Sequence, residues 1–163
     1  MRITKDVFPV AGFGKRFLPA TKVMPNELLL IVHKSLIQYS AEEAITTGID
    51  TLIFLNDRNK RAFEDRFTPN NELVTMLRAK GKFAQADMVR NIILEGVDCV
   101  FVRQAEQLGL GHAVLCAQRM VGDDPFAVLL ADDFLTDHEP GVTTDLACAF
   151  LDSRESRLSV MEA

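Results

Sequence analysis

Short continuous apolar runs alternate along the chain with longer stretches in which apolar residues recur every three or four positions. The runs predict strands whose two faces are both covered, because such strands show no polar alternation. These predicted strands span 7–10, 51–55, 98–102, 126–130 and 158–161. The periodic stretches predict helices at 36–45, 59–67, 73–80, 83–94, 112–121 and 143–154. Strands alternating with helices are typical of an α/β fold, so we expect a doubly wound, mostly parallel sheet.

Residues 11–34 interrupt this alternation, and we expect them to form a long functional loop. The stretch holds two glycines and two prolines, and cations cluster just after the first strand. Gly12 and Gly14 would let backbone N–H groups approach an anion closely, and Lys15 and Arg16 would neutralise its charge. A plain tight turn is the alternative explanation of the two glycines. The pattern favours a site for a phosphate-bearing ligand.

Two further polar clusters follow predicted strands, where open α/β sheets bind their ligands. Gln104 precedes a glycine-rich turn that contains Gly109, and Asp132 and Asp133 follow the strand 126–130. An amide and nearby backbone groups can read the edge of a base, and a carboxylate can hold Mg²⁺. Each cluster alone could be a helix cap or a surface loop, but their common placement favours one shared site. In that site Arg16 could bind phosphate oxygens during phosphoryl or nucleotidyl transfer.

The charge distribution supports an anionic small molecule over a nucleic acid. The 163 residues, enough for one domain with a core, carry a net charge of −5. Residues 1–34, however, hold six Lys/Arg against two Asp/Glu. With no Trp and one Tyr, the chain also offers few rings on which nucleic-acid bases could stack. No apolar run is long enough to span a membrane, and the N-terminus lacks a signal-peptide core.

The three cysteines predict a reducing environment. Cys99, Cys116 and Cys148 are odd in number, widely spaced and set in apolar runs. This spacing forms neither a CxxC pair nor a disulfide framework. We therefore expect buried reduced thiols and a cytoplasmic protein.

Three motifs together resemble those of a known family. FPVAGFGKRFLPATKVMPNELL and the later KSLIQY resemble the signature of sugar-phosphate nucleotidyltransferases, GxGTRxLPxTKxxPKEMLPxxxKPxIxY in form. RQAEQLGLGHAVLCA and GDDPFAVLLADDFL look specifically like the bacterial UTP–glucose-1-phosphate uridylyltransferases. The resemblance runs from about residue 6 to about residue 136 and continues weakly to the end. It implies a Rossmann-like nucleotidyltransferase fold and the Mg²⁺-dependent conversion of UTP and glucose 1-phosphate to UDP-glucose and pyrophosphate.

The resemblance also implies roles for individual residues. Arg16 would be catalytic, holding the triphosphate and stabilising the leaving pyrophosphate, and Asp132 would bind Mg²⁺. Asp133 would lie beside the metal or the ribose. The nucleotide would be bound by residues from both glycine turns, namely Ala11, Gly12, Gly14, Lys15, Gln104 and Gly109.

The chain departs from the family pattern within the signature loop. Lys15 replaces Thr, Asn26 replaces a phosphate-facing Lys, Leu30 replaces the Pro of Met-Leu-Pro, and Ser35 replaces the Pro of Lys-Pro. Losing a cation on phosphate would remove a charge-assisted bond of about 1.5–3 kcal/mol.

Length is a second departure. Residues 1–163 would form a single nucleotide-binding α/β domain, truncated relative to the family and incomplete at its C-terminal end. Little of the glucose-phosphate pocket would then be present. An apolar sheet edge would remain open, so we expect a homo-oligomer.

The first alternative to an active transferase is a non-catalytic nucleotide-binding remnant or interaction module of the same fold. A Rossmann dehydrogenase-like domain is less consistent with the sequence, because no third glycine and immediate helix follow Gly14.

Overall fold

The computed structural model describes residues 2–10, 25–56, 61–68, 70–92, 96–133 and 140–160, with only the backbone described at 61–63. Its centre is a four-stranded sheet in the order β5-β4-β1-β6. The strands are β1 (Lys5–Pro9), β4 (Thr51–Asn56), β5 (Asp98–Arg103) and β6 (Phe126–Val128). All neighbouring pairs are parallel, which confirms the predicted sheet.

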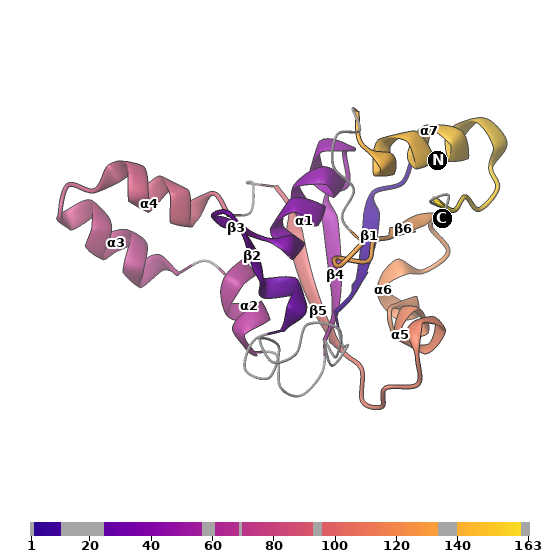
Figure 1. Cartoon of the computed structure of the whole chain (residues 1–163), viewed down its shortest axis with the longest axis horizontal. Coiled ribbons are helices and arrows are strands. Elements are labelled where there is room, and N and C mark those ends of the chain that lie inside the picture. Colours follow the sequence, from indigo (N-terminus) through magenta and orange to yellow (C-terminus); the bar gives the residue numbers. More distant parts are fainter. Residues whose placement is uncertain are drawn as a thin grey trace.

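Helices cover the sheet on both faces. Side chains alternate along each strand, so neighbouring residues pack against helices on opposite faces. Phe8 of β1 packs on one face with Ile37 and Ala41 of α1 (Leu36–Thr46). Val7 packs on the other face with Ala113 of α5 (Leu110–Cys116) and Val121 of α6 (Gln118–Val121). Figure 1 shows these helices on either side of the sheet. The fold is therefore doubly wound, as predicted.

A run of stacked phenylalanine rings joins the central strands to the helix that follows β4. Phe54 of β4 lies between Phe8 and Phe67, with centroid distances of 5.1 and 4.7 Å. Phe101 of β5 stacks on the same ring at 5.5 Å. Aromatic pairs at such distances contribute roughly 0.5–1.5 kcal/mol beyond their buried area. This cluster ties α2 (Arg61–Phe67) to the sheet.

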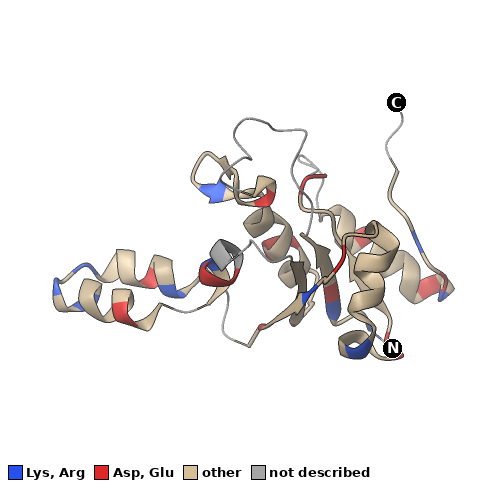
Figure 2. Cartoon of the chain, turned by 90° about the horizontal axis from the view of Figure 1, so that it is seen from below, with Lys and Arg blue, Asp and Glu red and all other residues tan. Residues whose placement is uncertain are grey.

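Two helices form an arm that stands out from the body (Figure 1). They are α3 (Asn71–Ala79) and α4 (Phe83–Arg90), which pack on each other. The side chain of Asn70 accepts a hydrogen bond from the N–H of Leu73 at 2.9 Å and so caps α3. Basic residues gather near the turn that joins the two helices (Figure 2). The predicted helix 83–94 ends earlier, at Arg90, and residues 93–95 lie outside the described ranges.

The predicted loop 11–34 is in part structured. Residues 11–24 lie outside the described part of the chain. Beyond them lie a short 3-10 helix, η3 (Asn26–Leu28), and an antiparallel hairpin of β2 (Leu30–Ile31) and β3 (Lys34–Ser35). The prediction of loop throughout was therefore wrong for these residues, whose apolar run is too short to stand out as a hairpin.

The predicted helix 112–121 begins earlier and is divided. It starts at Leu110 and breaks at Ala117, whose N–H donates to the carbonyl of Val114 at 3.0 Å. This tighter three-residue bond ends α5 and redirects the chain into α6. The last helix, α7 (Val142–Ser153), agrees with its prediction to within one residue at each end.

Near the C-terminal end, one predicted strand is present in shortened form and another was wrong. The strand 126–130 is regular only over Phe126–Val128, and both of these end residues are exposed, by 37% and 41%. Leu158 and Val160 form no strand and are 83% and 80% exposed. A strand needs a neighbour for its N–H and C=O groups, and the described chain supplies none to this segment or to the outer edge of β6. Within the described ranges, no helix has both the length and the apolar character that crossing a bilayer requires.

Candidate functional site along the carboxyl edge of the sheet

The carboxyl ends of the four strands lie along one edge of the sheet, because all neighbouring pairs are parallel. Gln104 directly follows β5, and Asp132 and Asp133 follow β6 after a short connection. These two strands are the outer ones, separated by three strand spacings, or roughly 14 Å. Between them β1 leads into residues 11–24. The predicted base-binding and metal-binding residues therefore flank the start of the glycine loop.

Gln104 is held by its backbone and by its side chain. Its N–H donates to the carbonyl of Asn56 at 2.8 Å, which extends the pairing of β4 and β5 by one residue. Its Nε2 lies 2.9 Å from Nδ1 of His112 in α5. Only 4% of the residue is exposed. A buried amide fixed at both ends is suited to reading a flat hydrogen-bonding partner, and the pairing with His112 was missed from the sequence.

Gly109 precedes the first turn of α5 with a φ of +93°. A Cβ at this position would meet nothing within 4 Å. The requirement for glycine is therefore the backbone conformation and not lack of space. The carbonyl of Gly109 accepts the N–H of Ala113 at 3.0 Å and so begins the helix that carries His112.

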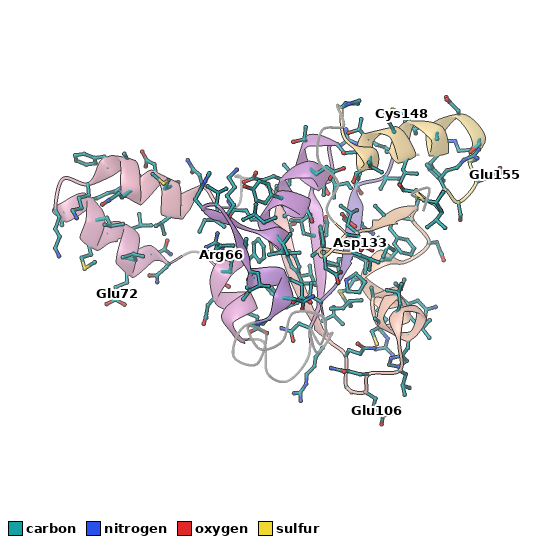
Figure 3. The ribbon with its side chains drawn as sticks, in the orientation of Figure 1. Arg66, Glu72, Glu106, Asp133, Cys148 and Glu155 are labelled. Carbon is teal, nitrogen blue, oxygen red and sulfur yellow. The ribbon has the colours of Figure 1, made fainter. Side chains whose placement is uncertain are left out.

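Asp132 and Asp133 are exposed and lie in a turn after β6. The N–H of Asp133 donates to the carbonyl of Leu130 at 3.1 Å, which closes the turn. Asp133 is labelled in Figure 3. Within the described part of the chain, no three His, Cys, Asp or Glu side chains cluster as a metal site would require. Carboxylate oxygens nonetheless suit Mg²⁺, which commonly takes one or two of them and completes its shell with water and phosphate oxygens. The pair fits a metal of that kind.

A groove of about 1190 Å³ opens beside these aspartates, between β6 and α7. Mostly apolar residues line it, among them Val128, Leu146 and Phe150. At its side, Glu43 of α1 accepts the N–H of Thr143 at 2.8 Å and so anchors the first turn of α7. The groove is therefore a large uncovered surface next to the predicted metal residues.

A polar network lies at the base of the β2–β3 hairpin. Lys34 donates to Glu42 at 2.7 Å, and Nε2 of Gln38 donates to the same carboxylate at 3.1 Å. Arg66 of α2 in turn donates to Oε1 of Gln38. The side chain of Lys34 is only 31% exposed. Its charge is thus paired within the protein, and no local sequence pattern links Arg66 to α1.

Asp6 is a second polar group that the sequence did not single out. It lies inside β1 and is fully buried. Burial raises the pKa of its carboxyl group well above the ordinary value, and the charge of Glu43 raises this pKa further. The N–H groups of Val7 and Leu129 lower this pKa, but burial is the larger effect. Neither carboxyl oxygen has a hydrogen-bond partner among the described residues.

The remaining predicted site residues, Ala11, Gly12, Gly14, Lys15 and Arg16, lie outside the described residues. Asn26, which the resemblance aligns with a lysine of the family signature, is buried in η3. The described part of the site thus contains Gln104, Gly109, Asp132 and Asp133.

The parallel sheet and the polar groups along its carboxyl edge place the chain among doubly wound α/β proteins, whose ligands bind at that edge. Sequence comparison defines the class further, because the model of the family described as Nucleotidyl transferase matches residues 7–157. The chain belongs to this family.

Its relatives include two enzymes from Bacillus subtilis strain 168. UTP–glucose-1-phosphate uridylyltransferase YngB is 47% identical over 141 residues, which are 86% of this chain and 47% of the relative. A second protein with the name UTP–glucose-1-phosphate uridylyltransferase is 46% identical over 141 residues, which cover 86% and 48% of the two chains. The chain therefore spans about half the length of these relatives.

Solved structures show the same partial match. The UTP-bound UGPase from Acinetobacter baumannii superposes with a TM-score of 0.89 at 40% identity, over 93% of this chain and 54% of that one. A UDP-glucose pyrophosphorylase complexed with UDP-glucose gives a TM-score of 0.74 at 41% identity, over 93% and 55%. The predicted resemblance to the uridylyltransferases is confirmed.

Proposed function

We propose that this chain binds UTP and forms the nucleotide-binding part of a UTP–glucose-1-phosphate uridylyltransferase. The observation that carries the proposal is the TM-score of 0.89, over 93% of this chain, to an enzyme described as UTP-bound. A structural match of this extent at 40% identity supports a common site as well as a common fold.

The proposed reaction joins two substrates without a protein nucleophile. A phosphate oxygen of glucose 1-phosphate attacks the α-phosphorus of UTP. The bond from that phosphorus to the bridging oxygen breaks, and pyrophosphate leaves with the electron pair, giving UDP-glucose. Positioning and charge stabilisation are sufficient for such a transfer.

Each part of the site has a proposed role in this reaction. Gln104 and the backbone around Gly109 hold uracil. Ala11 and Gly12 contact uracil and ribose through their backbone, and Gly14 and Lys15 also bind the nucleotide. Arg16 holds the triphosphate and stabilises charge on the leaving pyrophosphate. Asp132 binds Mg²⁺ with Asp133 beside it, and the ion neutralises phosphate charge when bound.

A second candidate function is a nucleotide-binding protein without turnover, or an interaction module. It is favoured by the groove of about 1190 Å³ beside Asp132, whose apolar lining offers a surface to a partner. In this case UTP binds without turnover.

Calorimetric titration with UTP and Mg²⁺, together with an assay of pyrophosphate release on addition of glucose 1-phosphate, separates the two. Binding with release supports the transferase, and binding without release supports the second candidate. Asp132→Asn should weaken UTP binding in Mg²⁺ about tenfold, because a charge-assisted contact is lost. Asp152→Asn, at an exposed position of α7, is the control and should change nothing. Failure of UTP, ATP and TTP alike to bind would overturn both nucleotide-binding candidates and leave the interaction module.

We infer further that the protein acts in the cytoplasm and associates with copies of itself. The described cysteines form no disulfide, which agrees with a reducing compartment. The uncovered groove and the open edge of β6 offer an apolar surface for association.

A further inference from the structure

We propose that His112 is a positioning residue that fixes the amide orientation of Gln104 and so determines which pyrimidine base the site accepts. This inference rests on the proposed binding of UTP. It assigns to His112 a role in specificity.

The geometry places the two side chains in direct contact. Nε2 of Gln104 lies 2.9 Å from Nδ1 of His112. Gln104 is buried and anchored to Asn56 through its backbone, and α5 carries His112 beside it. Ala113, the next residue, is only 3% exposed and packs against the sheet. Both partners therefore lie on elements that the core holds in place.

The contact determines which hydrogen-bonding groups of Gln104 remain for a ligand. An amide nitrogen carries two hydrogens, and one of them donates to Nδ1. Oε1 and the other N–H then remain side by side as an acceptor and a donor. The structure gives Oε1 no hydrogen bond within the described part of the chain. Among the described residues, one acceptor–donor pair in a fixed order is thus left for a ligand.

That order distinguishes uracil from cytosine. Uracil presents N3–H as a donor next to a carbonyl acceptor, which complements Oε1 and the N–H of a correctly turned amide. Cytosine presents N3 as an acceptor next to an amino donor, which is the reverse order. A site that hydrogen-bonds one pattern rejects the other, because its buried polar groups are then left unpaired.

His112 prevents the amide from turning over to suit cytosine. Turned over, Oε1 would face Nδ1, and this contact is favourable only if Nδ1 carries a proton. The neutral imidazole with its proton on Nε2 offers Nδ1 as an acceptor only. In this tautomer His112 therefore keeps the amide in the orientation that complements uracil.

The test compares UTP and CTP binding by calorimetry in Mg²⁺. The two nucleotides share the same triphosphate, so the ratio of their dissociation constants cancels contributions from the phosphates. His112→Ala should reduce the preference for UTP about tenfold, the worth of one buried hydrogen bond. His112→Asp keeps a partner that only accepts hydrogen bonds, so the ratio of the two dissociation constants should stay at the wild-type value. The binding of both nucleotides should weaken, because the added negative charge repels the triphosphate. His33→Ala, in the exposed turn of the β2–β3 hairpin, is the matched control and should leave the ratio unchanged.

Each result supports or overturns the inference. An unchanged ratio in His112→Ala, with the wild type still preferring UTP, overturns the role of His112 and leaves the proposed function standing. If His112→Asp reduces the preference for UTP as much as His112→Ala does, the inference is also overturned, because His112 would then have only a structural role. A wild type that binds no nucleotide overturns the proposed function and this inference together. If His112→Ala does not fold, His112→Gln replaces it and should show the same reduction, because its longer side chain moves the polar group away from Gln104.

Discussion

The carboxyl group of Asp6 illustrates how one residue can work against the fold. It is fully buried in β1, and burial raises its pKa. Above the ordinary pKa of about 3.9 the unfolded chain releases this proton, whereas the folded chain retains it up to the raised pKa. The folded state thus binds more protons in this window. The contribution of Asp6 to stability is therefore most favourable below the unfolded pKa and falls as pH rises through the raised pKa.

Asp6→Asn should therefore stabilise the protein at neutral pH by about 1–2 kcal/mol. Asn has nearly the same shape as Asp but no acidic group, so no charge has to be buried. Urea unfolding at pH 5 and pH 7.5 measures this, with a larger gain expected at the higher pH. Asp152→Asn, exposed on α7, serves as the control and should have no effect at either pH. A smaller gain at pH 7.5 than at pH 5 would contradict the explanation.

The cysteines differ in their reactivity because their surroundings differ. Burial raises the pKa of the Cys99 thiol to about 12, with a further contribution from the charge of Asp98. Cys148 is exposed on α7. Iodoacetamide at pH 8 should therefore modify Cys148 well before Cys99, as peptide mass spectrometry over time would measure. Equal rates in the folded protein would contradict this prediction, whereas modification of Cys99 after unfolding agrees with it.

The apolar neighbours of a cysteine in the sequence did not predict its burial correctly. Cys99 and Cys116 are only half-buried, and Cys148 is exposed, although all three were expected to be buried. Cys148 lies on a helix, so its sequence neighbours point in different directions. Which side of α7 is covered depends on what packs against that helix, and the sequence alone does not give this.

At the scale of an element, the β2–β3 hairpin carries conformational strain. Val32 in its turn has a φ of +61° and is 88% exposed. A positive φ is costly for a β-branched residue, whereas Gly and Asn accept it readily. Val32→Asn should therefore raise the free energy of unfolding by about 1 kcal/mol.

Thermal or urea unfolding measures this gain. His33→Asn tests whether any asparagine in the turn has the same effect, because His33 lacks a positive φ. It should shift stability by less than about 0.5 kcal/mol. Equal gains from both substitutions would contradict an origin in the backbone of Val32.

The regular elements were largely predictable, because a local apolar pattern determines them. The strands β1, β4 and β5 and the helices α1 and α7 all appear where the pattern places them. The β2–β3 hairpin was missed because its strands have only two residues each. The break at Ala117 was missed because it changes the direction of an apolar helix without changing its composition.

At the scale of the whole molecule, one edge of the sheet stays open among the described residues, although helices cover both of its faces. The outer edge of β6 has no partner strand within the described residues, and the apolar groove adjoins it. If this surface drives association, the average mass in analytical ultracentrifugation should rise with protein concentration. Val128→Lys should reduce that rise, because a charge on an edge strand opposes pairing.

Met88→Lys is the matched control for this experiment. Met88 is an exposed apolar residue of the α3–α4 arm, and it does not line the groove. Met88→Lys should leave self-association unchanged. If it disperses the protein as effectively as Val128→Lys, the contact lies on the arm and not at the groove.

The sequence predicted the candidate site in outline but not its internal contacts. Parallel strands imply one carboxyl edge, so polar residues after separate strands could be expected to share it. Gln104, Asp132 and Asp133 follow that expectation. The contact of Gln104 with His112 could not be predicted, because it depends on α5 beginning at Leu110 and on the angle at which it packs.

The position of β1 between β4 and β6 also affects how the chain reaches its folded state. Lys5 at the start of β1 donates to Asp124, 119 positions away, and pairs in register with Phe126 of β6. Contacts between such distant positions require closing a very long loop, which slows folding. During synthesis β1 emerges before β6, so its β6 side stays uncovered until the segments between the two strands have followed. The nascent chain must therefore keep an apolar strand from pairing wrongly while those segments are made.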